Sequence, residues 1–307
     1  MNILKTKYGD LKNPIIGGKY PNGEIEELRF EEKNVLNING KEFIPVHDIL
    51  NSRKKDFSSV KFFEDGNIRA LSLQDATNIT TDNGEFEVEK IIFYEDGKYN
   101  RLFFLNGRLS GFWSEEDEYE LAKEYSFKLN FAEIKAKFIS MRLYKSQKLK
   151  SLTLWPKEII EVPYKNIKIK TRIGVSLFED GSPESCEPNL PIKIETPIGI
   201  IEAYDKNAVG VHGEDNSLKF YKDGSIKSLI TSTNVIKVYD DIGLISLHTP
   251  QEERLFVNDD ILDIITVDIE FKGDTVIIDG EYEYSVSDNK FKIEYYGEKR
   301  LTLSGDI

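Results

Sequence analysis

The chain has 307 residues with a formal net charge of −13 at pH 7, and 39% of its residues are hydrophobic. The negative charge opposes binding to nucleic acids and to anionic membranes, and no apolar run approaches the length of a membrane span. The single cysteine excludes an intramolecular disulfide, and the first residues lack the apolar segment of a signal peptide, so we expect a soluble cytoplasmic protein.

A short β-hairpin pattern returns seven times along the chain. Each copy is anchored on a glycine, or once on Gln147. In chain order the copies read KYPNG (19–23), FFEDG (62–66), FYEDG (93–97), FFLNG (103–107), LYKSQ (143–147), LFEDG (177–181) and FYKDG (220–224). Asn-Gly and Asp-Gly are the strongest short hairpin signals, so we expect turns at 22–23, 65–66, 96–97, 106–107, 180–181 and 223–224.

Three positions of each copy carry apolar residues. Three residues before the anchor (−3) stand Tyr20, Phe63, Tyr94, Phe104, Tyr144, Phe178 and Tyr221. Two residues after it (+2) stand Ile25, Ile68, Tyr99, Leu109, Leu149, Pro183 and Ile226. Five residues after it (+5) stand Leu28, Leu71, Leu102, Phe112, Leu152, Cys186 and Leu229.

The loop length decides how these positions pair. A two-residue type I′ loop places −3 opposite +2, whereas a three-residue loop with a glycine bulge pairs them differently. In either case side-chain alternation predicts that +2 and +5 lie on opposite faces of one strand. We therefore expect hairpins that are apolar on both faces and buried between neighbours.

A second motif lies between the copies, and non-repeat segments interrupt the array. INGKEF (38–43), TDNGEF (81–86), TRIGVS (171–176), TPIGII (196–201) and DIGLIS (241–246) share a glycine and a return strand. Residues 46–57 have a short helical spacing of apolar residues. Residues 114–125 have a stronger helix signal, because Ser114 can cap an acidic first turn.

These patterns predict an all-β fold of tandem antiparallel β-hairpin repeats in a solenoid-like or long meander sheet. Residues 1–260 form the expected array, with helical insertions at 46–57 and 114–125. Residues 261–307 alternate well but lack the aromatic anchor, so we assign them as a C-terminal β cap that covers the last open face.

Few residues suggest chemistry. Cys186 fills the +5 slot of its copy, where a buried, inert thiol is expected; the alternative is a nucleophile. Glu158 and Glu187 lie at related points of neighbouring repeats, and two carboxylates about 5–10 Å apart could act as a glycosidase pair. Trp113 and Trp155 could stack on a sugar, although aromatic residues in strands more often belong to the core.

Metal and cofactor signals are lacking. His47, His212 and His248 show no metal-ligand spacing, and each is expected to be exposed or structurally bonded. The acidic turns do not form a calcium-loop motif, and no phosphate-binding or nucleophile-elbow motif is present. We therefore expect no metal and no cofactor.

The Phe220 to Leu229 segment, with its F-Y-x-D-G-x-I-x-S-L core, resembles the hairpin units of MORN-repeat proteins and of related bacterial antitoxin-like repeat proteins. The resemblance covers the repeat cores, about half of the chain. The further glycines and the tryptophan of the MORN pattern are absent here. The resemblance implies an extended antiparallel sheet that serves as a scaffold or binding surface, and it carries over no functional residue.

Three functions are compatible with the sequence. The first is a non-catalytic β-repeat scaffold that binds another protein. The second is an antitoxin or immunity-like protein that neutralises a basic partner through its acidic surface. The third is a carbohydrate-binding or carbohydrate-active protein that uses Glu158, Glu187 and the tryptophans. The sequence leaves the oligomeric state open.

Overall fold

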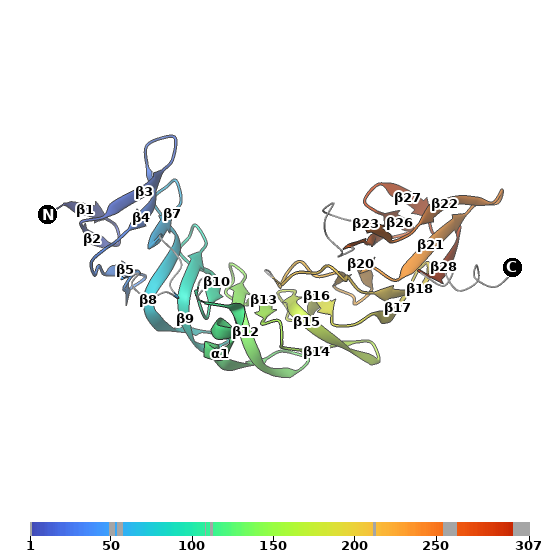
Figure 1. Cartoon of the computed structure of the whole chain (residues 1–307), viewed down its shortest axis with the longest axis horizontal. Coiled ribbons are helices and arrows are strands. Elements are labelled where there is room, and N and C mark those ends of the chain that lie inside the picture. Colours follow the sequence, from blue (N-terminus) through green and yellow to red (C-terminus); the bar gives the residue numbers. More distant parts are fainter. Residues whose placement is uncertain are drawn as a thin grey trace. The chain divides into compact units, whose positions relative to one another are not determined.

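A computed structural model describes residues 2–48, 53, 58–107, 109–110, 113–210, 213–253 and 263–296. These residues are mostly strands joined by tight turns, with one short helix, which confirms the predicted all-β class (Figure 1). The chain divides into two compact units. Unit 1 comprises residues 1–129 and 133–155, and unit 2 comprises residues 130–132 and 156–307.

Unit 1 is built on an antiparallel meander in the order β3-β4-β7-β8-β9-β10-β12-β13. The meander strands are β3 (Ile15–Lys19), β4 (Ile25–Arg29), β7 (Val60–Phe62), β8 (Ile68–Thr81), β9 (Gly84–Phe93), β10 (Tyr99–Phe103), β12 (Glu133–Leu143) and β13 (Leu149–Leu154). The remaining elements are β1 (Ile3–Thr6), β2 (Gly9–Lys12), β5 (Leu36–Ile38), β6 (Lys41–Phe43), α1 (Glu115–Leu121) and β11 (Glu124–Lys128).

Unit 2 has a second meander in the order β14-β15-β16-β19-β20-β25-β26-β27. Its strands are β14 (Ile160–Tyr164), β15 (Ile167–Leu177), β16 (Pro183–Pro188), β19 (Leu218–Phe220), β20 (Ile226–Thr231), β25 (Val267–Lys272), β26 (Thr275–Ile278) and β27 (Tyr282–Ser285). The remaining strands are β17 (Ile192–Thr196), β18 (Gly199–Ala203), β21 (Asn234–Tyr239), β22 (Leu244–His248), β23 (Gln251–Glu253), β24 (Asp263–Ile265) and β28 (Lys290–Tyr295).

Six of the seven repeat copies form the same turn. The −3 carbonyl accepts a hydrogen bond from the anchor N–H, and the −3 N–H donates to the carbonyl after the anchor, at 2.7 to 2.9 Å. The anchors have φ between +69° and +93°, and Gln147 adopts this conformation in the copy that lacks glycine. This is the three-residue loop with a left-handed third residue, so the two-residue alternative is wrong for these copies.

A β-bulge after each turn overturns the expected two-sided hairpin. In the second copy Phe62 faces Ile68, Val60 faces Leu71, and the register shifts between these two pairs. The extra residue on the outgoing strand brings +2 and +5 to the same face, because two of its residues there oppose one on the incoming strand. Simple alternation therefore fails here, and each hairpin has one apolar face.

The +5 position forms the centre of the core. All six described residues at this position are 0% exposed: Leu28, Leu71, Leu102, Leu152, Cys186 and Leu229. Val60 and Leu218, which pair with Leu71 and Leu229, are at most 1% exposed. Burial of a leucine-sized side chain stabilises the fold by about 1.5–3 kcal/mol, so this row is a main source of stability in each unit.

Three of the aromatic −3 residues are tyrosines that join neighbouring hairpins of the meander. The hydroxyl of Tyr20 donates to the Phe62 carbonyl at 2.8 Å, and that of Tyr94 donates to the Leu143 carbonyl at 2.7 Å. Tyr221 makes the same bond to a β25 carbonyl in unit 2. An aromatic ring with a polar tip suits this half-buried position.

The second motif forms hairpins in four of its five copies, with strand pairs β5–β6, β8–β9, β17–β18 and β21–β22. Two further short hairpins, β1–β2 and β14–β15, were not predicted. Residues from them pack on the meanders: Tyr8 stacks on Phe62, and Tyr164 stacks on Phe220. The copy at 171–176 is wrong, because it lies inside β15, where Ile173 has a φ of +61° and the strand continues through an irregularity.

The copy at 103–107 also departs from the expectation. β10 ends at Phe103 and pairs with β12, and the Phe104 N–H donates to the Ile139 carbonyl. Gly107 does not have positive φ. Instead its N–H donates to the Glu118 carboxylate at 2.7 Å, and a Cβ at this position would lie 1.9 Å from a Glu118 oxygen. Phe112 of this copy lies outside the described residues.

The helix predicted within 114–125 is present as α1 but is shorter than expected, because it ends at Leu121 and residues 124–125 already belong to β11. Ser114 is its N-cap, and its hydroxyl and the Asp117 carboxylate each accept a hydrogen bond from the other residue's N–H. The expected insertion at 46–57 lies largely outside the described residues. In the expected cap, β25 to β27 continue the unit 2 meander beyond β20, and β28 pairs with β21. The role of 261–307 as a cap stays a prediction.

Candidate functional site

Glu187 is a sequence-predicted candidate whose carboxyl group is buried. It lies on β16 and is 1% exposed. Its two carboxylate oxygens accept from the Ser217 N–H at 2.7 Å and from the Ser217 hydroxyl at 2.9 Å, and Arg172 lies 4.0 Å away. Burial raises the Glu187 pKa to about 7, although Ser217 and Arg172 oppose this rise. The carboxyl can therefore change its charge near neutral pH.

The proposed glycosidase partner of Glu187 lies elsewhere in unit 2. Glu158 is half-buried in the segment between β13 and β14. The described charges that shift the Glu187 pKa are Arg172 and Asp205, and Glu158 is not among them. Trp155 is 6% exposed, and the Trp113 ring nitrogen donates to Glu118 at 2.7 Å. The geometry thus gives the carbohydrate hypothesis no assembled site among the described residues.

Cys186 is buried in its leucine slot as predicted. It is 0% exposed, and burial raises the pKa of its thiol to about 12. A thiol that ionises only at such high pH is a poor nucleophile at neutral pH. Its position in the core row of unit 2 explains the raised pKa, since the thiolate would lose its hydration there.

The histidines differ in their surroundings. His47 donates from Nδ1 to the Pro45 carbonyl at 3.0 Å, and His212 lies outside the described residues. His248 contacts Ser246 through Nε2 at 2.9 Å and Asp279 through Nδ1 at 3.3 Å, an order that resembles a Ser-His-Asp chain.

The His248 network has a structural explanation. The Tyr284 hydroxyl lies 3.0 Å from the same Nε2, and the histidine side chain is 4% exposed. His248 also packs edge-on against two tyrosine rings of β27. The ring therefore connects the β22-β21-β28 sheet to the meander, and its bonds are made within the protein.

A buried ionic cluster in unit 1 gave no sequence signal. The Arg53 guanidinium makes paired hydrogen bonds to Glu89 and to Glu118, all at 2.9 Å. Glu118 also accepts from Gly107 and Trp113. The partners are up to 65 residues apart in sequence, so only folding brings them together. Because the carboxylates accept several hydrogen bonds, we interpret the cluster as structural: Glu118 of α1 holds Arg53, Gly107 and Trp113 in place.

The clearest exposed feature is the edge strand β22. Within the described residues it pairs only with β21, in the sheet order β22-β21-β28. Leu244, Ile245 and Leu247 are 54%, 48% and 52% exposed, and Ile242 in the preceding turn is 97% exposed. A register shift brings Leu244 and Leu247 to one face, opposite Tyr239 and Lys237.

Edge strands are commonly protected by charged residues, prolines or covering elements. β22 reads LISLH and carries neither a lysine, an acidic residue nor a proline. Acidic residues follow on either side along the chain, with Asp240 and Asp241 before β22 and Glu252 and Glu253 after it. The strand is therefore an apolar edge between two acidic segments.

The sequence predicted a return strand at 241–246. It did not predict that this strand would be exposed, because that depends on which strands pair with it in the fold. Comparisons with protein-family models, with curated proteins and with solved structures find no match. The described residues contain no helix that is long and apolar enough to cross a membrane.

Proposed function

We propose that this protein is a non-catalytic β-hairpin-repeat protein that binds another protein, and that β22 is the edge to which the partner adds a strand. The observation that carries the proposal is the exposed, uncharged edge of β22. Strand addition supplies backbone hydrogen bonds to such an edge, and side chains on alternate positions supply specificity. Large exposed apolar groups side by side are a recurrent mark of protein interfaces.

The partner's chemistry follows from the surroundings of β22. An extended partner segment would place apolar side chains beside Leu244 and Leu247. A basic residue at its end would meet Asp240 and Asp241 in the turn before β22. The net charge of −13 acts in the same direction, because opposite fields speed encounter. This basic partner also accommodates the antitoxin-like alternative, whose resemblance stays a prediction.

The test uses a double variant, Leu244→Lys with Leu247→Lys, which places two cations on the exposed face of β22. Both side chains are about half exposed, so the fold should persist. Affinity capture from a native lysate should recover a basic protein with the wild type. The double variant should lose that protein, because like charges repel it and the apolar contacts are gone.

The matched control is Leu190→Lys, a leucine that is 66% exposed in the loop after β16. It should capture the same protein as the wild type. Capture should weaken between low and high salt, since exposed charges are screened beyond about 8 Å at physiological ionic strength. A partner that the double variant retains would contradict the assignment of β22. Capture of an acidic partner, or of a partner whose binding does not change with salt concentration, would contradict the proposal that the partner is basic.

A second copy of the chain is the competing occupant of the edge. Light scattering over a range of concentrations separates the two cases. Wild-type dimers that the double variant abolishes would show self-pairing of β22 and would overturn the proposal of a different partner.

A further inference from the structure

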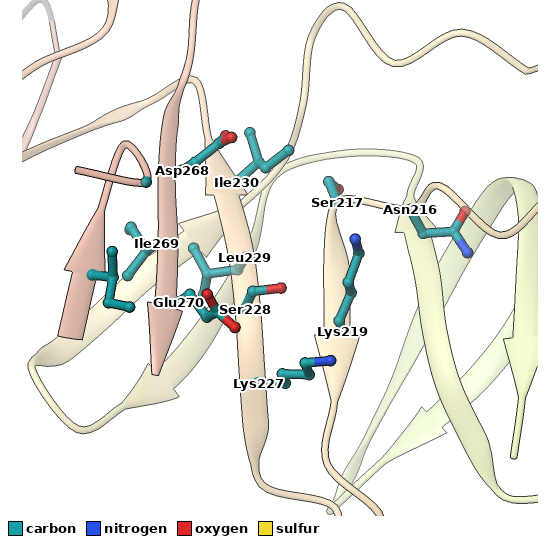
Figure 2. Close-up of a pocket in the computed structure, with 12 residues that line it drawn as sticks. Asn216, Ser217, Lys219, Lys227, Ser228, Leu229, Ile230, Asp268, Ile269 and Glu270 are labelled. Carbon is teal, nitrogen blue, oxygen red and sulfur yellow. The ribbon is translucent and has the colours of Figure 1, made fainter. Parts of the chain in front are cut away.

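A cavity of about 330 Å³ lies on the unit 2 meander, on the face opposite the apolar core. Figure 2 shows it over β19, β20 and β25, with Lys219, Ser228 and Glu270 across the three strands. On the other side of the same strands Leu218, Leu229 and Ile269 are at most 1% exposed. The cavity is therefore built on a rigid, well-packed floor.

The strand register explains why this part of the face is hollow. Ser228 pairs with Lys219 on one side and with Glu270 on the other. Neighbouring strands are about 4.8 Å apart, so the two long side chains start about 10 Å from each other with only a serine between them. The β20 bulge lies next to this row, between Ile226 and Ser228. It contains Lys227, whose side chain also lines the cavity.

The charges around the cavity are incompletely paired. Among the described residues, Lys219 and Lys227 have no ion-pair partner, and the Asp268 carboxylate accepts no hydrogen bond. Glu270, by contrast, is paired with Lys272 at 2.9 Å. Partial desolvation and the carboxylates of Asp279 and Asp205 raise the pKa of Asp268, and the Lys219 charge opposes this rise. Lys219 and Asp268 therefore act on each other across the cavity without forming an ion pair.

Hydrogen-bonding groups accompany these charges. The Ser228 hydroxyl projects toward the side of the cavity where Lys219 and Lys227 lie (Figure 2). Asn216 lines the cavity only at its edge, because its side chain points away from the two lysines and its amide nitrogen donates to the Ser185 hydroxyl and the Gly213 carbonyl (Figure 2).

A ligand of a single charge fits this arrangement poorly. An anion would meet Asp268, and a cation would meet two lysines. A ligand with both charges would satisfy each side, with its carboxylate at Lys219, Lys227 and Ser228 and its ammonium group at Asp268. We propose that the cavity binds a small zwitterion that carries a carboxylate and a protonated amine, of the size of an amino acid or a dipeptide.

The test is a titration of the whole chain with glycylglycine, followed by calorimetry or by chemical-shift changes of the Ser228 and Asp268 amides. A small ligand held by a few charged contacts should bind with a Kd of about 1 mM. N-acetylglycylglycine lacks the ammonium group and glycylglycine amide lacks the carboxylate. Each should bind about tenfold more weakly, because one half of the site is left unmatched.

Variants assign the effect to residues. Lys219→Met and Asp268→Asn should each weaken glycylglycine binding about tenfold. Lys290→Met, at an exposed lysine at the start of β28, should leave it unchanged. The β22 double variant should also bind normally, so failure of this proposal and failure of the partner proposal are distinguishable.

Three outcomes would overturn the proposal. The first is absence of saturable binding at about ten times the expected Kd. The second is equal binding of the acetylated peptide, which would identify a plain anion site. The third is displacement of glycylglycine by equimolar inorganic phosphate, which would indicate an adventitious ion only.

Discussion

At the scale of single residues, adjacent positions on β16 have opposite environments. Cys186 points into the apolar core, whereas Glu187 points to the other face and accepts two hydrogen bonds from Ser217. Both side chains are at most 1% exposed, and burial disfavours the charged form of each. The pKa of the thiol therefore lies far above neutral pH, while that of the carboxyl lies close to it.

Glu187→Gln should remove a pH dependence of stability. The pKa of Glu187 is about 7 in the folded chain and near its ordinary value of 4.5 in the unfolded chain. The folded state thus keeps a proton that the unfolded state loses between these values, so the free energy of unfolding falls as pH rises through this window. The glutamine variant lacks this loss and should be more stable than the wild type at pH 8 by about 3 kcal/mol.

Urea unfolding at pH 5 and pH 8 measures the effect. The difference between variant and wild type should grow with pH, because only the wild type has to ionise a buried carboxyl. A difference that is equal at the two pH values would contradict the raised pKa. The neutral amide can keep both Ser217 contacts, since the serine hydroxyl can accept as well as donate.

Cys186 should react slowly with thiol reagents in the native protein. Its thiol is buried and its pKa is about 12, so at pH 8 both access and ionisation are unfavourable. We expect native labelling at least about 100-fold slower than labelling of the chain in denaturant, which serves as the control. Equal rates would show that the core around β16 opens readily.

At the scale of elements, the repeat unit is a turn followed by a bulge. The turn requires a left-handed third residue, and an Asp or Asn side chain before it accepts the N–H of the residue after it in five copies, among them Asp65 and Asp223. The bulge then brings two apolar residues that are three apart to one face. The turn and the bulge together give each hairpin one apolar face. A sheet built from such hairpins has to be covered on that face by a second layer.

Gly66→Ala should destabilise unit 1 by about 1 kcal/mol. The φ of Gly66 is +75°, and a Cβ built there meets no atom within 4 Å, so backbone strain is the only expected effect. Gly66→Asn should lose less stability than Gly66→Ala, because asparagine tolerates a positive φ better than alanine does. Glu64→Ala in the same turn is the control and should be nearly neutral. Thermal unfolding measures all three, and equal effects of alanine and asparagine would count against the strain argument.

At the scale of the whole molecule, two meanders share one plan, and charge distinguishes their surfaces from their cores. The net charge of −13 is of the kind that opposes aggregation of strand-rich chains, and it would attract a basic partner. Against this background, two local exceptions among the described residues are the uncharged strand β22 and the two cavity lysines, Lys219 and Lys227, which have no ion-pair partner.

The purified protein should contain no stoichiometric metal ion. The chain has one cysteine and three histidines, and the described residues hold no group of three or more His, Cys, Asp or Glu side chains placed to bind a metal. Elemental analysis checks this directly. A bound metal whose removal by a chelator lowers the melting temperature would refute it.

The sequence by itself determined the features that depend on short-range chemistry. Asp-Gly and Asn-Gly dipeptides predicted most of the hairpin turns, the leucines at +5 predicted the core row, and Ser114 predicted the helix cap. Each of these needs only residues within one turn or one hairpin. The positions of the turns and of the core residues along a repeated pattern can therefore be predicted without knowledge of the fold.

Only the tertiary structure decided what depends on distant partners. The bulge that brings Ile68 and Leu71 to one face depends on cross-strand pairing, which alternation alone cannot reveal. Glu187 is held by Ser217, 30 residues away, and β22 is an edge because, within the described part of the chain, it pairs with β21 alone. Such contacts connect segments that are distant in sequence. Neither segment's sequence identifies the other as its partner, because backbone hydrogen bonds can pair strands of almost any side-chain composition.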